Sequence, residues 1–219
     1  MIILLTDRSF LYFDYLRKIF TINSLADILS LRVIQRFIFY NMNFIDLVIK
    51  RRSIRNYSSR AVSRDLLDKL FESARLAPSA CNRQPWFFVA IDDPGLKNAV
   101  AVCAFSGIYS INKFAQDAPV LVAVVRESSG CAVSLAGFLK GTKYSLIDIG
   151  MACEHFALSA EDQGLGTCFL GWFNEKKVKK ILNIPKQRKI DMLISVGYPK
   201  NSDTVDKIRK SLDEIRIYR

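Results

Sequence analysis

Residues 120–125, with the sequence Val-Leu-Val-Ala-Val-Val, form an uninterrupted apolar run that is rich in β-branched side chains. Such a run favours a strand, and the absence of alternation with polar residues indicates burial on both faces. The sequence therefore predicts a sheet with this strand at its centre rather than at its edge.

Strand and helix patterns mix around this run along one continuous domain. Apolar runs predict three further strands, at 86–91, 167–171 and 192–197. The longest predicted helix, 144–163, carries small and apolar residues on more than one face, which suits the core or a subunit interface. Other helices are predicted at 44–51, 63–77 and 96–104, after Asn174, and in a short segment at 212–217, with an irregular stretch before Pro119.

The composition is globular, because half of the 219 residues are hydrophobic and 24% are charged. The net charge of +11 suggests acidic partners, such as cofactor phosphate, nucleic acid or a membrane surface. No run of 18 or more uncharged apolar residues occurs, so neither a membrane span nor a membrane partner is expected. The five cysteines include no C-x-x-C pair, so we expect no metal site, and reduced thiols fit a cytoplasmic protein. The only histidine, His155, lies in an apolar helical run and is interpreted as structural.

Residues 1–41 differ from the rest of the chain. They are rich in Phe, Ile, Leu and Tyr, but Asp7 and Arg8 interrupt the apolar stretch early and no small-residue cleavage site follows, which argues against a signal peptide. Two interpretations stay open: an amphipathic helical extension, or a true start of translation at Met42. The second is preferred, and 42–219 is the predicted domain.

The segment 51–55, Arg-Arg-Ser-Ile-Arg, places three guanidinium groups and a hydroxyl within five residues. Arginine donors match phosphate oxygens, and three like charges this close repel one another unless an anion lies among them. Near the C-terminus, Lys207 and Arg209 can share one side of an extended segment. The alternatives are a solvated basic surface for the first segment and a solubilising terminus for the second.

The loop 77–86 offers polar groups to a planar ligand. It holds Ser79, Asn82 and Gln84 between two prolines, and amides suit the edge of a flat heteroaromatic ring. The alternative is that these groups satisfy the backbone of the loop itself.

Glycines between residues 164 and 171 follow a helix and enter a strand, which is the reverse of a dinucleotide fingerprint and excludes a Rossmann site. Gly171 still allows a ligand close to the backbone. There is no Walker sequence, and no aromatics interleave with the basic runs, which weakens nucleic-acid binding. The residues alone predict a protein that holds a phosphorylated, planar ligand.

These segments together resemble the nitroreductase family of FMN-dependent oxidoreductases, over about residues 42–217. Lys50–Arg55 resembles the motif that holds the FMN phosphate and ribityl chain, and Pro78–Trp86 resembles the second motif. Phe169–Phe173 resembles the segment whose backbone lies over the isoalloxazine face, and Lys207–Ile215 the basic motif that returns to the phosphate.

The resemblance implies an α+β fold with a central mixed sheet flanked by helices, and a homodimer whose FMN sites lie at the interface. It implies a flavoprotein that takes hydride from NADH or NADPH and reduces a small oxidised acceptor, such as a nitroaromatic or a quinone, in a ping-pong cycle. The flavin does this chemistry, so no side chain is assigned an acid–base role. The residues implied to bind the cofactor are Arg51, Arg52, Ser53, Arg55, Pro78, Ser79, Ala80, Asn82, Gln84, Leu170, Gly171, Lys207 and Arg209.

Other functions stay open. A specialised enzyme on the same scaffold, such as an enone reductase, a dehalogenase or a flavin-fragmenting enzyme, is one, and a non-catalytic flavin-binding sensor is another. Nucleic-acid binding would give a steeply salt-dependent affinity, and no nucleic-acid partner is expected. Trp172 stands where many members have a glycine, so its indole is expected to narrow the flavin pocket, and Asn112 and Lys113 lie nearest to an asparagine and a lysine that contact FMN in some members.

Overall fold

A computed structural model describes residues 43–127, 139–201 and 207–219 of the chain. Its four strands form an antiparallel sheet of order β1-β2-β4-β3, with β1 at Trp86–Ile91, β2 at Val120–Arg126, β3 at Gly166–Leu170 and β4 at Lys189–Gly197. Strand β2 pairs with both β1 and β4 and is buried from Val120 to Val125, which confirms the predicted central strand. A parallel pairing is added at the sheet edge by the isolated bridge between Ser53 and Thr167.

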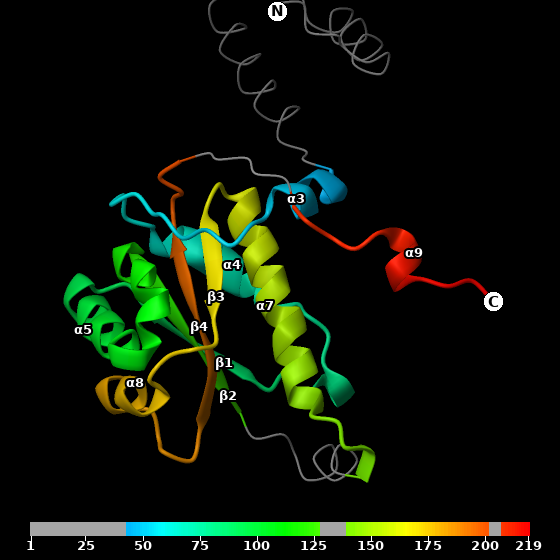
Figure 1. Cartoon of the computed structure of the whole chain (residues 1–219). Helices are drawn as coiled ribbons and strands as arrows, with labels where there is room; N and C mark the ends of the chain where they lie inside the picture. Colours follow the sequence, from blue (N-terminus) through cyan, green and yellow to red (C-terminus); the bar gives the residue numbers. More distant parts are fainter. Residues whose placement is uncertain (1–42, 128–138, 202–206) are drawn as a thin grey trace, which may run out of the picture. The chain divides into compact units, whose positions relative to one another are not determined.

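Helices cover both faces of this sheet, which confirms the predicted α+β class (Figure 1). Helices α4 and α7 pack on one face, and α5, α8 and the 3-10 segment η2 pack on the other. Two short elements, α3 and α9, bury none of their side chains. The bounds are α3 Phe44–Lys50, α4 Arg64–Arg75, η1 Ala80–Asn82, α5 Pro94–Ala104, η2 Gly107–Asp117, α7 Tyr144–Asp162, α8 Glu175–Ile181 and α9 Leu212–Ile215.

The core divides between the two faces because successive side chains of a strand point in opposite directions. Val122 and Val124 of β2 pack toward α4 and α7 together with Phe156, whereas Leu121 and Ala123 pack toward α5 and α8. Each fully buried Leu or Phe side chain stabilises the fold by about 1.5–3 kcal/mol. Both faces of β2 therefore contribute to stability, which explains the lack of polar residues in this run.

Capping residues decide where several helices begin. The Asp93 carboxylate accepts a hydrogen bond from the backbone N–H of Leu96 (2.7 Å), and Pro94 begins α5 two residues earlier than predicted, since its fixed φ suits the first turn. Asn174 caps α8, as predicted, by accepting from the N–H of Lys177 (3.1 Å). Ser63 precedes α4 without a side-chain capping bond. The stretch 107–117, predicted as irregular, forms η2 with a kink at Asn112.

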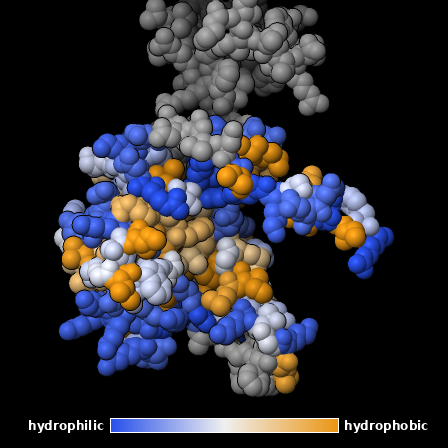
Figure 2. Space-filling model, in the orientation of Figure 1, coloured by the Kyte–Doolittle hydropathy of each residue, from blue (hydrophilic) through white to orange (hydrophobic). Residues whose placement is uncertain are grey.

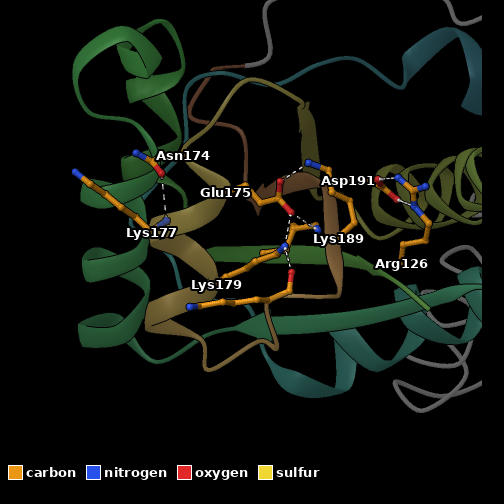
Figure 3. A network of polar contacts seen from close by, with 9 residues as sticks. Arg126, Asn174, Glu175, Lys177, Lys179, Lys189 and Asp191 are labelled. Carbon is orange, nitrogen blue, oxygen red and sulfur yellow. Dashed lines mark hydrogen bonds and ion pairs between the residues drawn. The ribbon is translucent and has the colours of Figure 1, made fainter. Parts of the chain in front are cut away.

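A polar network fixes the start of α8 against β4 (Figure 3). The Glu175 carboxylate accepts from the Ile190 N–H (3.0 Å) and from Lys179 (2.9 Å), and it also pairs with Lys189. Beside it, Arg126 of β2 forms a bidentate pair with Asp191 of β4. The chain that leaves β3 toward α8 is thereby anchored just after Gly171.

Several predictions fall partly or wholly outside the described residues. The proposed extension, residues 1–41, lies outside them, and so does Cys131. The other four cysteines are free thiols, and burial raises the pKa of Cys153 to about 12, as expected for an unreactive core thiol. None of the helices in the described ranges is long and apolar enough to cross a membrane.

Candidate functional site

The basic segment leaves α3 and runs along the open edge of β3. Ser53 forms a parallel bridge with Thr167, and the N–H of Ile54 donates to the Thr167 carbonyl (2.8 Å). Gly166 permits this approach, because a Cβ at that position would lie 2.4 Å from Cγ1 of Ile54. The segment is therefore held at the sheet edge by a single bridge, with a defined conformation.

A buried tyrosine holds the far end of the same segment. The Tyr57 hydroxyl donates to the carbonyl of Ile54 (2.7 Å) and lies 2.7 Å from Oγ of Ser195 on β4. Burial raises the pKa of Tyr57 well above its usual range, so the phenol stays protonated and remains a hydrogen-bond donor. A second bridge, between Tyr57 and Pro199, continues the pairing toward the end of β4.

The basic segment and the C-terminal segment meet in one cavity of about 550 Å³. Six of the predicted cofactor residues line it. They belong to two segments that lie more than 150 residues apart in the sequence. The same two parts of the chain are joined by a hydrogen bond from Lys207 to the Val48 carbonyl (2.5 Å). Two asparagines and two isoleucines complete the wall. The lining residues are Arg51, Arg52, Ser53, Ile54, Arg55, Asn56, Asn201, Lys207, Ile208 and Arg209.

Cationic groups dominate this cavity. Burial lowers the pKa of Lys207, and the nearby guanidinium groups of Arg51, Arg209 and Arg52 lower it further. Arg55 lies over the ring of Phe114 in η2, with 5.9 Å between its Cζ and the ring centroid. An anion that entered the cavity would relieve this repulsion and raise the pKa of the lysine.

Two carboxylates of α7 offset part of the repulsion that the sequence predicts. The Glu154 carboxylate pairs with Arg51 at 3.6 Å, and Glu161 lies seven residues, or about two turns, further along the helix. Burial raises the pKa of Glu161, while Lys50, Arg51 and Lys207 lower it. The cluster is thus partly balanced by the chain itself, and a bound anion is not its only compensation.

The loop 78–84 does not line the cavity of its own chain. Cys81, Asn82 and Gln84 adopt left-handed backbone conformations with φ between 48° and 53°. The hydroxyl of Ser79 accepts from the N–H of Gln84 (2.9 Å), and the Gln84 amide donates to Oδ1 of Asn82 (3.1 Å). These polar groups stabilise the loop internally, as the structural alternative predicts, while Asn82 and Gln84 remain exposed.

At the end of β3, the backbone at Gly171 is accessible to a ligand, whereas the side chain of Leu170 is not. Leu170 is buried in the core, and Gly171 is exposed, with no atom within 4 Å of a Cβ built on it. The Trp172 indole is 54% exposed and donates to the Ile108 carbonyl of η2 (2.9 Å), while the Asn112 amide donates to the Trp172 carbonyl (2.8 Å). Trp172 is therefore held against η2, with the Tyr109 ring 5.2 Å from its own.

Comparison with known proteins decides the family. The model of the nitroreductase family matches residues 48–198, a span that includes the basic segment, the loop 78–84 and the exit of β3. The chain belongs to the nitroreductase family.

Individual relatives cover most of this nitroreductase-family chain. Iodotyrosine deiodinase 1 of Rattus norvegicus is 29% identical over 200 residues, covering 81% of this chain and 70% of the rat protein. An NADH dehydrogenase of Thermus thermophilus is 28% identical, covering 69% of this chain and 84% of its own. The crystal structure of a nitroreductase family protein from Clostridium novyi superposes on this chain with a TM-score of 0.62 and 30% sequence identity. The match covers 74% of this chain and 87% of the Clostridium novyi chain. The family and these relatives support an oxidoreductase.

Some residues of this nitroreductase-family site carried no recognisable signal in the sequence. Asn56 and Asn201 are single polar residues outside the helices and strands, and nothing local distinguishes them from ordinary loop residues. Glu154 and Glu161 lie on the long helix α7, and acidic residues on a helix normally face water. Asn112, which lies near an asparagine position that contacts FMN in some members, donates to the Trp172 carbonyl in this chain.

Proposed function

We propose that this chain is an FMN-dependent oxidoreductase that uses NADH or NADPH to reduce a small oxidised acceptor, such as a nitroaromatic or a quinone. The observation that carries the proposal is the cavity in which Arg51, Arg52, Ser53, Arg55, Lys207 and Arg209 converge. Guanidinium, ammonium and hydroxyl donors in one cavity are the set that a phosphate monoester requires.

Residues in and beyond the cavity would contact the other parts of FMN, its ribityl chain and its ring. The residues around the cavity would hold the phosphate and ribityl chain, and the backbone of Leu170 and Gly171 would lie along the ring, where no Cβ obstructs it. When bound, FMN supplies the hydride chemistry between the nicotinamide and the acceptor. Pro78, Ser79, Ala80, Asn82 and Gln84 would present donors and acceptors to the polar edge of the ring, so the protein binds and orients while no side chain is assigned to proton transfer.

The proposal includes a homodimer with an FMN site at each side of the interface. The loop 78–84 and the basic cavity lie apart within one chain, so a second copy would supply the loop. Leu146 and Ile147 of α7 and Phe169 of β3 are exposed apolar side chains. In Figure 2, apolar residues gather near the middle of the face in view. The C-terminal segment 207–219 also exposes Ile208, Leu212, Ile215, Ile217 and Tyr218, which a partner would cover. The domain from 42 to 219 and a cytoplasmic location, which the free thiols support, belong to the same proposal.

An absorbance spectrum tests the cofactor assignment. The purified protein, supplied with FMN and freed of excess ligand, is expected to retain the flavin bands and to lose them when NADH or NADPH is added without oxygen. A protein that stays colourless after incubation with FMN would refute the proposal. Retention of FMN without reduction by either nicotinamide would identify the flavin-binding sensor instead.

A second candidate, reductive dehalogenation, is favoured by the relative named iodotyrosine deiodinase 1, with which this chain shares 29% identity over 81% of its length. Steady-state assays with 3-iodotyrosine and with a nitroaromatic compound, each as the sole acceptor, would separate the two functions. Iodide release with no nitroaromatic reduction supports the dehalogenase. The same assay extended to a cyclic enone tests the enone reductase.

A further inference from the structure

A buried carboxylate on α7 makes the contact that carries this inference. Asp148 is 3% exposed, and its Oδ1 accepts a hydrogen bond from the backbone N–H of Ala80 (3.1 Å), 68 positions away in the sequence. Its neighbours on the buried side of the helix, Ile149 and Ala152, are apolar core residues. Burying a carboxylate is costly, so a position that keeps one in such surroundings usually has a specific partner.

The partner belongs to the loop that the proposed function assigns to the flavin ring. Ser79, at the N-cap of η1, has extended backbone angles, and Cys81, Asn82 and Gln84 follow in left-handed conformations. Asparagine tolerates such a conformation, but it is unfavourable for Cys and Gln and persists there only where the surroundings hold it.

The other bonds of the loop do not anchor it. Within the described part of the chain, Asn82 N–H donates to the Ser79 carbonyl (3.0 Å), Arg83 N–H donates to the Ala80 carbonyl (3.2 Å), and the Gln84 groups bond to Ser79 and Asn82. All of these bonds stay inside residues 79–84. The bond between Ala80 and Asp148 is the one that ties the loop to a core helix.

We propose that Asp148 is a positioning residue, which fixes the backbone of Ala80 on α7 and so sets the direction in which Ser79, Asn82 and Gln84 meet the ring. This rests on the proposed function, because the loop needs a defined orientation only if it reads a ligand. The role belongs to the accepted hydrogen bond rather than to the negative charge. An amide oxygen at the same position can accept the same bond, and a methyl group cannot.

Two substitutions separate these roles. In Asp148→Ala the loop loses its anchor, and the dissociation constant of FMN, measured by fluorescence titration of the dimeric protein, is expected to rise at least about tenfold, which corresponds to about 1.4 kcal/mol. In Asp148→Asn it is expected to stay within about threefold of the wild type. Asp162→Ala removes a carboxylate at the other end of α7, far along the helix from the loop, and serves as the matched control. Wild-type affinity in folded Asp148→Ala would overturn the proposal, as would an equal loss in both Asp148 variants.

Amide hydrogen exchange gives a readout that needs no flavin, and its first comparison, within the wild-type protein, needs no variant. The Ala80 amide of the wild-type protein is expected to exchange at least about tenfold more slowly than the amide of Cys81, and a segment covering residues 77–85 is expected to exchange faster in Asp148→Ala alone. An unprotected Ala80 amide in the wild type would refute the anchoring, whether or not Asp148→Ala folds. If wild-type protein binds no FMN while Ala80 is protected, the proposed function fails and the anchoring stands.

Discussion

The carboxylate of Glu154 lies 3.6 Å from the guanidinium of Arg51, so helix α7 provides a counter-charge to the basic cavity. The pair is partly exposed and is therefore worth only about 0–1 kcal/mol in stability. Its consequence is mainly geometric, because Arg51 is held beside the cavity while its remaining N–H donors can still reach a ligand.

Replacement of Arg51 by alanine is expected to weaken FMN binding by about 1.5–3 kcal/mol, or roughly 10- to 150-fold, because a charge-assisted bond to the phosphate is lost. Fluorescence titration at fixed ionic strength measures this change. Arg60→Ala is the control, since this guanidinium stacks on the Tyr198 ring (3.9 Å) and does not line the cavity. An equal effect in both variants would mean that only net charge matters.

Gly166→Ala is expected to destabilise the protein by about 1–3 kcal/mol, because the new methyl group would collide with Ile54, which cannot move without displacing the basic segment from the sheet edge. FMN affinity should fall as well, since Arg51 to Arg55 shift with Ile54. Urea unfolding and FMN titration measure the two effects. The matched control is Gly150→Ala on α7, where the space is open and alanine should be neutral or stabilising by up to about 1 kcal/mol. Unchanged stability in Gly166→Ala would show that the basic segment is not packed against β3 at this point.

Glu175→Gln is expected to cost about 1–2 kcal/mol at neutral pH, because the network that joins α8 to β4 loses its charge. Burial alone would raise the pKa of Glu175, but hydrogen bonds from Lys189, Lys179 and the Ile190 N–H bring it below its usual range. A depressed carboxylate pKa gives stability that is present above the unfolded-state pKa and is lost as the pH falls.

The difference between the wild type and Glu175→Gln should therefore shrink as the pH falls from about 5 to about 3. Urea unfolding at a series of pH values measures it. Glu72→Gln, which alters the solvent-exposed pair with Arg75, should show a much smaller difference at neutral pH. A Glu175→Gln deficit that does not vary with pH would show that the ionised form is not what stabilises the network.

Removal of residues 212–219 is expected to shift the protein from dimer toward monomer, because the segment exposes Leu212, Ile215, Ile217 and Tyr218. The truncation leaves Lys207 and Arg209 in the chain. Sedimentation velocity over a range of concentrations measures the shift. A variant in which a Gly/Ser sequence of equal length replaces 212–219 separates the apolar side chains from chain length. A truncated protein that dimerises as tightly as the wild type would contradict this role.

Local pattern accounts for the elements and for half of the candidate site. The run at 120–125 was predictable as the central strand, since its lack of polar residues suits only a position covered on both faces. Asn174 as a helix cap and Gly164 just after α7 follow from the conformations those residues favour. Arg51 to Arg55 and Lys207 to Arg209 were recognisable as candidate anion-binding segments, because several cations in a few residues need a counter-charge, and the structure brings them to one cavity.

Packing alone decided the rest. Asp148, Glu154 and Glu161 lie on one helix, and their sequence does not say that the first meets the Ala80 N–H while the other two face the basic cluster. The left-handed backbone at Cys81 and Gln84 contradicts the preference of both residues, so no propensity could predict it. The sequence by itself thus determined which segments carry charge, apolar surface and turns. The tertiary structure determined which of them meet. Those contacts depend on the orientation of α7 about its own axis and on the close approach of the basic segment to β3 at Gly166.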